Sequence, residues 1–253
     1  MIMNDNEKNK RAIAMLIDGD NAQPSLIDKI LSEAGKYGAV SIRRIYGDWT
    51  TSNMGGWKES LNNHAIQPIQ QFRYTVGKNA TDSALIIDAM DLLHGKLADG
   101  FCLVSSDSDY TRLATRIREA GIFVMGIGQI KTPKAFVNAC NVFIYTENLM
   151  PQEPSRKSAG GRRGKKEEAP VRAADPLPLL RKAFDMAVEE NGWAKMGSIG
   201  MALRQLDPSF DPRTYGCRQL SQLFKPLDKV FELRFLNEND RVDILVKSRE
   251  EPR

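Results

Sequence analysis

The sequence predicts an α/β domain built on a mostly parallel sheet, followed by a second, smaller α+β unit. Between residues 12 and 145, short apolar runs alternate with amphipathic segments. Apolar strands separated by such helices are typical of a parallel sheet that is covered on both faces. Residues 151–174 are rich in Pro, Gly, Ser and charge, and residues 175–248 pass from helical spacing to two strand-like runs.

The elements of the first unit follow from the spacing of its apolar residues. In residues 81–94, for example, Leu85, Ala89 and Leu92 recur at helical intervals. The same criterion predicts helices at 25–37, 57–62, 81–94 and 110–120, and strands at 12–17, 40–46, 66–69, 101–104, 122–127 and 142–145. The order of these segments is that of a βαβα domain.

Composition excludes several classes of protein. No apolar run approaches the roughly 18 residues that span a bilayer. The polar N-terminus leads straight into a strand without a signal-peptide core. We therefore expect a cytoplasmic protein with no membrane association.

The few cysteines and histidines limit the chemistry of any active site. Cys102, Cys140 and Cys217 are far apart and form no C-x-x-C pair, so neither a disulfide framework nor a zinc site is expected. The chain has two histidines, which argues against catalysis by a Ser-His or Cys-His pair. A metal site in this chain must be built from carboxylates.

The excess positive charge lies in one short stretch. Residues 1–150 hold 16 basic and 16 acidic residues, and residues 173–253 hold 13 of each. Residues 151–172 hold 7 basic and 3 acidic residues, which accounts for the net charge of +4. We predict a basic flexible linker here. It is either a solvated tether or a contact to nucleic-acid phosphate.

Aspartates follow two of the predicted strands. Asp18 and Asp20 come directly after the first strand, and Asp107 and Asp109 come after the fourth. Asp82 begins the helix that precedes the fourth strand. In open α/β sheets, ligands bind at the carboxyl ends of the strands, at the topological switch point. If the fourth strand neighbours the first, these carboxylates converge on one crevice.

Each aspartate also has a simpler interpretation as a helix cap, worth about 1 kcal/mol. Capping uses one acid per helix, however, and does not explain doublets at two strand ends with a further acid, Asp82, nearby. Crowded carboxylates repel one another unless a cation neutralises them. Mg²⁺ and Mn²⁺ prefer oxygen ligands, and such a site suits metal-assisted phosphodiester hydrolysis. Asp88 lies about 240° around the helix from Asp82, so we interpret it as structural.

Basic and aromatic residues alternate in two segments of the first unit. "SIRRIYGDW" contains Arg43, and "FRYTVGK" contains Arg73 and Lys78. This combination suits single-stranded nucleic acid, because cations follow the backbone and rings stack on bases. An ordinary strand with a buried aromatic side remains an alternative, as does a solvated loop for Lys78.

Three linked stretches carry a family resemblance: "LIDGDNA", "GKNATDSALIIDAMD" and "LVSSDSDYTRLATRIREAGIFVMGIG". On these, residues 12–147 resemble the NYN family, the LabA-like branch of the PIN-like nuclease superfamily. The resemblance implies a PIN-like three-layer α/β/α sandwich and RNA cleavage that depends on Mg²⁺ or Mn²⁺. Matched by position, the metal-binding and catalytic acids are Asp18, Asp82, Asp107 and Asp109, with Asn21 as a hydrogen-bonding support.

The second unit resembles the OST-HTH/LOTUS domain, a winged-helix module. The matching stretches are Gly192-Trp193, "DPSFDPRTYG", a helix at 217–224, and the strands "VFELRF" and "VDILV". The resemblance implies RNA binding or, in some members, protein partners. We interpret Trp193 as a core residue. The candidate RNA contacts are Arg213, Arg218 and Lys225.

Together these observations predict a metal-dependent (endo)ribonuclease that acts on single-stranded RNA. Its nuclease domain is expected at 1–150, its linker at 151–174 and its RNA-binding winged-helix domain at 175–248. The alternatives are a non-catalytic RNA-binding adaptor and a small-molecule phosphatase. The sequence leaves open the RNA's identity, cleavage of DNA, endonucleolytic or exonucleolytic action, and the oligomeric state.

Overall fold

The structure, a computed structural model, describes residues 11–72, 80–150, 175–238 and 241–249. Contacts between residues divide the chain into two units, Met1–Met150 and Pro151–Arg253. Each unit is described by itself. The basic linker predicted at 151–174 lies outside the described residues.

The first unit is organised around a parallel sheet in the order β3-β2-β1-β4-β5-β6. Each neighbouring pair of these strands is parallel. The strands are β1 (Ala12–Asp18), β2 (Ala39–Gly47), β3 (Gln67–Gln70), β4 (Gly100–Val104), β5 (Phe123–Gly128) and β6 (Val142–Tyr145). The first strand pairs with the fourth, so the order reverses between β1 and β4 and places the topological switch point there.

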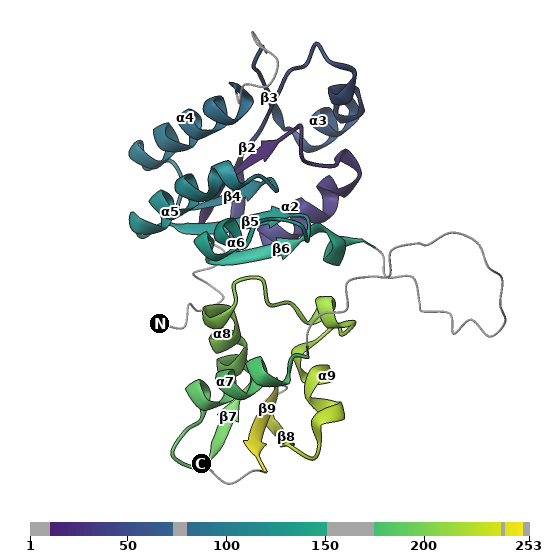
Figure 1. Ribbon diagram of the computed structural model, residues 1–253, viewed down its shortest axis with the longest axis vertical. Helices are drawn as coiled ribbons and strands as arrows, with labels where there is room; N and C mark the ends of the chain where they lie inside the picture. The colour runs from purple at the N-terminus through teal and green to yellow at the C-terminus, as the bar shows by residue number, and fades with distance from the viewer. Residues whose placement is uncertain (1–10, 73–79, 151–174, 239–240, 250–253) are drawn as a thin grey trace, which may run out of the picture. The chain divides into compact units, whose positions relative to one another are not determined.

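Helices cover both faces of this sheet (Figure 1). On one face lie α4 (Ala80–His94), α5 (Thr111–Glu119) and α6 (Lys134–Ala139), and on the other lie α2 (Ile27–Gly35) and α3 (Lys58–His64). The central strand shows why both faces must be covered, because every residue from 13 to 17 is apolar and 0% exposed. Leu16 packs towards α4 and α5, and Met15 packs towards α2. The predicted three-layer α/β/α fold is confirmed.

Two details differ from the sequence prediction. Helix α6 was not predicted, because a six-residue helix is too short for its apolar spacing to stand out. Its buried Phe136 and Val137 nevertheless complete the core on that face. The helix predicted at 57–62 is α3, which starts one residue later because Trp57 ends the 3-10 segment η2 (Ser52–Trp57).

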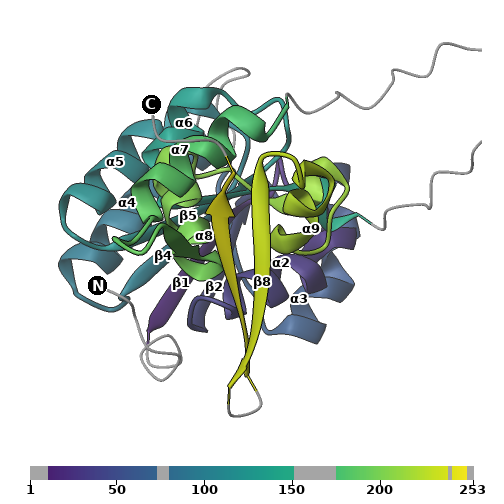
Figure 2. The same cartoon turned by 90° about the horizontal axis from the view of Figure 1, so that it is seen from below.

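The second unit combines helices with an antiparallel sheet in the order β7-β9-β8. Figure 2 shows β8 and β9 side by side along their length. Its elements are α7 (Leu177–Ala187), β7 (Trp193–Lys195), α8 (Met196–Leu206), η5 (Pro212–Tyr215), α9 (Leu220–Phe224), η6 (Lys225–Leu227), β8 (Phe231–Glu238) and β9 (Arg241–Ser248). Phe184, Phe224 and Phe231 centre its core. The predicted small α+β unit is confirmed.

Helix α9 is shorter than the helix predicted at 217–224. Gly216 has a φ of 76° and ends η5, a backbone conformation that glycine adopts without strain. Gln219 and Gln222 then form a capping box, which starts α9 at Leu220.

Candidate metal centre

The topology gathers the predicted acids at one edge of the first unit's sheet. Asp18 is the last residue of β1, and Asp107 and Asp109 lie in the loop after the neighbouring strand β4. Asp82 lies in the first turn of α4. Carboxylates from three separate segments therefore reach the switch point.

Three of these residues form what we call the acid cluster: Asp82, Asp107 and Asp109. Each offers one carboxylate oxygen, and the three oxygens lie within 4.8 Å of one another. Two oxygens that share one Mg²⁺ at about 2.1 Å are about 3 Å or 4 Å apart, depending on whether they are cis or trans. Small side-chain adjustments would suffice to bind one ion, so the acid cluster fits a hard divalent cation.

The cluster is electrostatically costly without a cation. Burial raises the pKa of the Asp82 carboxyl, and the negative charges of Asp107, Asp109 and Asp20 raise it further. The buried Tyr110 acts in the opposite direction, because its hydroxyl donates a hydrogen bond of 2.6 Å to Asp82 Oδ1. A bound cation would replace this repulsion by attraction.

Asp18 is not a member of the acid cluster by the same distance criterion. Its side chain is buried, and its Oδ2 accepts hydrogen bonds from Asn21 Nδ2 at 2.7 Å and Ser105 Oγ at 2.8 Å. The amide of Asp20 donates to Oδ1 at 3.1 Å. Burial raises the pKa of the Asp18 carboxyl most, and the charge of Asp82 adds to that effect. The structure thus separates Asp18 from the other three predicted ligands.

Local backbone geometry positions both acid-bearing loops. A Cβ on Gly19 would lie 2.8 Å from the Tyr46 carbonyl oxygen, which accepts the Gly19 amide at 2.9 Å, so this turn has no room for a side chain. In the other loop, Asp107 caps η3 (Ser108–Tyr110) by accepting the Asp109 amide at 2.9 Å. The capping interpretation therefore applies to Asp107, but it does not account for the convergence of the three acids.

Two positioning residues were missed by the sequence analysis. Ser105 joins the two loops, because its hydroxyl donates to Asp18 and accepts the Asp107 amide at 3.1 Å. Tyr110 holds Asp82 across 28 positions of sequence. The position of Ser105 directly after β4 was a usable signal. The Tyr110 contact depends on how α4 and η3 pack, and nothing in the sequence indicates it.

Asp88 lies on α4, the same helix as Asp82, but its hydrogen-bond partners are residues outside the acid cluster. Its Oδ2 accepts hydrogen bonds from Arg44 Nη1 and from the hydroxyl of the fully buried Tyr46, each at 2.9 Å. The Arg44 contact is also an ion pair. The residue ties α4 to β2, which agrees with its interpretation as structural.

Replacing Asp88 is expected to weaken the fold rather than the chemistry. Asp88→Ala leaves the Tyr46 hydroxyl and the Arg44 guanidinium without this acceptor, which costs about 1–3 kcal/mol. Urea unfolding followed by tryptophan fluorescence measures the loss. Asp91→Ala, at an exposed site one turn further along α4, is the control and should unfold like the wild type. Equal stability of the two variants would contradict the structural role.

Of the three candidate RNA contacts in the first unit, the structure describes only Arg43. Arg43 turns inward, since Nε donates to the Val40 carbonyl and Nη1 donates to the His64 carbonyl. We therefore remove Arg43 from the candidate contacts. Arg73 and Lys78 lie outside the described residues.

In the second unit, the Arg213 side chain is likewise bound to another residue of the protein. Its guanidinium forms an ion pair with the buried Asp211, with Nη2 at 2.6 Å from Oδ2. Arg218 and Lys225, which flank α9, are exposed. Trp193 is half-buried rather than part of the core, and the Arg234 guanidinium lies 4.4 Å from its ring centroid. The sequence prediction for Trp193 was therefore too simple.

The ion pair gives Arg213 a testable structural role. Arg213→Ala leaves the Asp211 carboxylate buried without its cation, so we expect the second unit to lose about 1–3 kcal/mol of stability. The affinity of the folded protein for RNA should not change. Fluorescence-detected unfolding and an RNA-binding titration, both at a temperature where the variant is folded, check this. A selective loss of RNA affinity would show instead that Arg213 contacts RNA.

The fold and the site define an open α/β protein with an acidic, metal-compatible crevice at its topological switch point. The chain belongs to the NYN domain family, whose model matches residues 12–148. The model of the OST-HTH/LOTUS domain matches residues 171–242. The NYN domain is part of the PIN-like nuclease superfamily, and the two domains together support a ribonuclease-type or RNA-binding role.

Comparisons with individual proteins are less informative. No curated protein matches the chain. Among solved structures, a protein of unknown function from Vibrio parahaemolyticus is 17% identical, with 56% of this chain and 94% of that one covered and a TM-score of 0.45. An uncharacterized protein from Nitrosomonas europaea is 24% identical, with 40% and 96% covered and a TM-score of 0.29. Neither similarity informs the chemistry of the site.

Within the part of the chain that the structure describes, no helix combines the length and the apolar character that crossing a bilayer requires.

Proposed function

We propose that this protein is a metal-dependent ribonuclease that hydrolyses phosphodiester bonds of single-stranded RNA. The observation that carries the proposal is the acid cluster, in which three carboxylates from two segments meet within 4.8 Å at the switch-point edge of the sheet. Membership of the NYN family supports it. A structural role would not require three like charges at this spacing, since they repel.

The donor set indicates which ion belongs there. Asp82, Asp107 and Asp109 would hold Mg²⁺ or Mn²⁺, because hard cations prefer carboxylate oxygens. When bound, such an ion supplies positive charge to the phosphodiester oxygens and lowers the pKa of water. Asp18 would contribute a further negative charge, since its carboxyl and that of Asp82 act on each other electrostatically.

The neighbouring residues keep these acids in place. The Tyr110 hydroxyl fixes one oxygen of Asp82, and the other oxygen would remain for a cation. Ser105 and Asn21 hold Asp18, and Ser105 also fixes the backbone at Asp107. This rigid support favours hydrolysis, because a site that is already organised needs little rearrangement in the transition state.

The second unit would hold the substrate. Its family match supports RNA binding, and the exposed Arg218 and Lys225 are the remaining proposed contacts to phosphate. Joining a binding unit to a catalytic unit raises the effective concentration of RNA at the acid cluster. A protein partner bound by the second unit is an alternative occupant.

A cleavage assay tests the proposal. End-labelled single-stranded RNA is incubated with the wild type, with Asp107→Asn and with Asp91→Asn, in Mn²⁺, Mg²⁺ or EDTA. We expect wild-type and Asp91→Asn protein to cut with metal and not with EDTA. Asp107→Asn should bind RNA and lose at least about 100-fold in rate, because a metal contributes several kcal/mol to such reactions.

The other outcomes of this assay have definite meanings. Cutting that persists in Asp107→Asn at the wild-type rate would place the active site elsewhere. Binding without cutting by the wild type, in both metals, would favour a non-catalytic RNA-binding role. Turnover of a generic phosphomonoester without RNA cleavage would favour a phosphatase.

A further inference from the structure

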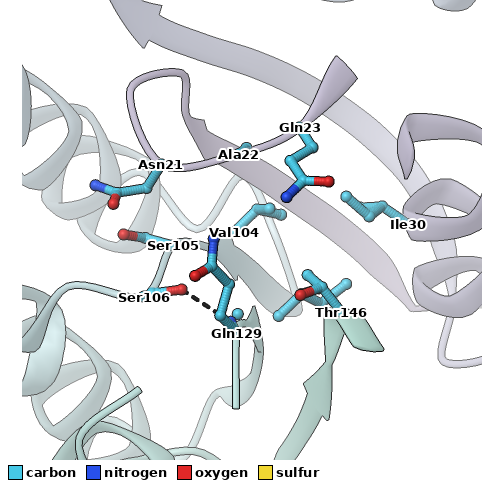
Figure 3. Close-up of a pocket in the computed structure, with 11 residues that line it drawn as sticks. Asn21, Ala22, Gln23, Ile30, Val104, Ser105, Ser106, Gln129 and Thr146 are labelled. Atoms are coloured by element: carbon cyan, nitrogen blue, oxygen red, sulfur yellow. Dashed lines mark hydrogen bonds between the residues drawn. The ribbon is translucent and has the colours of Figure 1, made fainter. Parts of the chain in front are cut away.

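The pocket beside Asp18 is too small to hold a nucleobase. Asn21 and Ser105, which donate hydrogen bonds to Asp18, line it together with residues at the ends of β4 and β5 (Figure 3). Its cavity volume is about 10 Å³, which is room for about one water molecule. If the protein binds RNA as proposed, the contacts that hold the strand lie outside this pocket.

The sheet of the second unit has one face in the core and an outer face. Side chains alternate between the two faces along each strand. Ala194, Val246 and Leu233 lie opposite one another on the three strands and pack in the core. The positions on either side of them therefore belong to the outer face. The rows of that face are Trp193 with Lys247 and Glu232, and Lys195 with Leu245 and Arg234.

Basic residues gather on this outer face. Arg249 continues β9 on the same side, since its Nη2 lies 3.9 Å from Glu232 Oε2. Among the residues whose side chains the structure describes, the acids of this face are Glu232 and Asp243. Residues 173–253 hold equal numbers of acidic and basic residues, so the excess of positive charge here is local. We call the four exposed basic residues of this face the cationic face: Lys195, Arg234, Lys247 and Arg249.

Two of these cations lie against the Trp193 ring. The Arg234 guanidinium carbon is 4.4 Å from the ring centroid, and Lys247 Nζ is 5.7 Å from it. A guanidinium that stacks on an aromatic ring keeps the N–H groups on its edge available for an anion. Within the described ranges, no carboxylate forms an ion pair with Lys195, Arg234 or Lys247. Three like charges are therefore held close together, an arrangement that an anion stabilises.

We propose that the cationic face binds the phosphate backbone of single-stranded RNA. This rests on the proposed function, because it names a surface by which the second unit would hold the substrate. Neighbouring rows of the face are about 7 Å apart, so one strand can contact several of its cations at once. Basic side chains beside an aromatic residue are typical of surfaces that bind single strands. Trp193 is half-buried with Arg234 over its ring, so it positions the cation rather than stacking on a base.

A binding titration of the full-length protein in EDTA, where no metal-dependent cutting occurs, tests the surface. Lys195→Gln/Lys247→Gln removes two charges from the cationic face. We expect its affinity for labelled single-stranded RNA to fall about tenfold, and the slope of log affinity against log salt to decrease by about 1 to 2. The control is Lys182→Gln/Arg204→Gln, which removes two charges at exposed sites on α7 and α8 and should bind like the wild type. Equal affinities of the two double variants would overturn the proposal.

The indole N–H signal of Trp193 shows where the ligand binds. In ¹⁵N-labelled protein, this signal is identified by its absence in Trp193→Phe. We expect RNA and an abasic oligonucleotide of equal length to shift it, because the contacts are to phosphate. The signal of Trp57, which is buried in the first unit, is the reference. An unchanged Trp193 signal at saturating RNA would contradict the proposal, and tighter binding of poly-glutamate than of RNA would favour an acidic protein partner instead.

Failure of this proposal differs from failure of the nuclease. If the wild type binds RNA in EDTA but does not cut it with metal, the proposed catalysis fails, and the titration still decides the binding surface. If the wild type cuts RNA and the Lys195→Gln/Lys247→Gln variant binds it with wild-type affinity, only the cationic face is refuted. A wild type that binds no RNA refutes both the cationic face and the proposed role of the second unit.

Discussion

Asp82→Asn is expected to abolish metal-dependent RNA cleavage and at the same time to stabilise the metal-free protein. The loss of rate should be about 100- to 1,000-fold, because one ligand of the cation loses its charge. The gain in stability follows from the raised pKa of Asp82, which burial and the neighbouring acids cause. The amide oxygen of the new side chain can still accept the Tyr110 hydroxyl.

The pH dependence of this gain has a definite sign. Because the pKa of Asp82 is raised above the ordinary value of 3.8, the folded protein binds this proton at a higher pH than the unfolded chain does. The stability of the wild type therefore falls as pH rises from about 4 through the raised pKa. Asp82→Asn removes that fall. The two proteins should be equally stable in acid, and the variant should melt at a higher temperature than the wild type at neutral pH.

Thermal unfolding in EDTA and in Mn²⁺ measures both effects. Mn²⁺ should raise the melting temperature of the wild type, since a ligand that binds only the folded state stabilises it, and should do little for Asp82→Asn. Asp91→Asn, an exposed acid on the same helix, should behave like the wild type. A variant that melts lower than the wild type in EDTA and still responds to Mn²⁺ would contradict the electrostatic account.

Reversing the charge of both residues that flank α9 should weaken RNA binding strongly. Arg218 and Lys225 are exposed, and each is proposed to contact phosphate. Arg218→Glu/Lys225→Glu should lower affinity about 10- to 100-fold and reduce the slope of log affinity against log salt by about 2. Cleavage at saturating RNA should be unaffected, because the acid cluster is in the other unit.

Filter binding or fluorescence anisotropy at several salt concentrations measures this change. The matched control is Lys182→Glu/Arg204→Glu, which makes the same change in charge at exposed sites on α7 and α8. It should keep most of the affinity. If both double variants lose affinity equally, only the net charge of the unit matters and the α9 flank is not a contact surface.

The strand pattern was sufficient to predict the fold of the first unit. Continuous burial along β1 required helices on both faces. The convergence of the acids was conditional on β1 and β4 being neighbours, and the two strands do pair. Helix α6 escaped prediction because it has fewer than two turns. Local spacing therefore revealed the long elements and the edge of the sheet where the acids meet.

The detailed geometry of the site depends on contacts that sequence spacing does not encode. Asp18 is held in place by Ser105, 87 positions away, whose hydroxyl donates to it. Arg43 reaches the His64 carbonyl across 21 positions, so a basic residue in a promising segment is turned inward. Such contacts follow from packing between distant segments. The residue types of the site were readable from the sequence, and their partners were not.

The most direct measurement is a metal-specificity switch at Asp107. Asp107→Cys replaces a carboxylate by a thiolate, which prefers softer ions. RNA cleavage by this variant is compared in Mg²⁺ and Cd²⁺ with that of the wild type and of Asp107→Ser, which has similar size and no soft ligand. The expected result is loss of cleavage with Mg²⁺ and recovery of at least about tenfold with Cd²⁺ in Asp107→Cys alone. Cleavage by Asp107→Cys with Mg²⁺ at the wild-type rate, or an equal Cd²⁺ gain in Asp107→Ser, would show that Asp107 does not bind the catalytic metal.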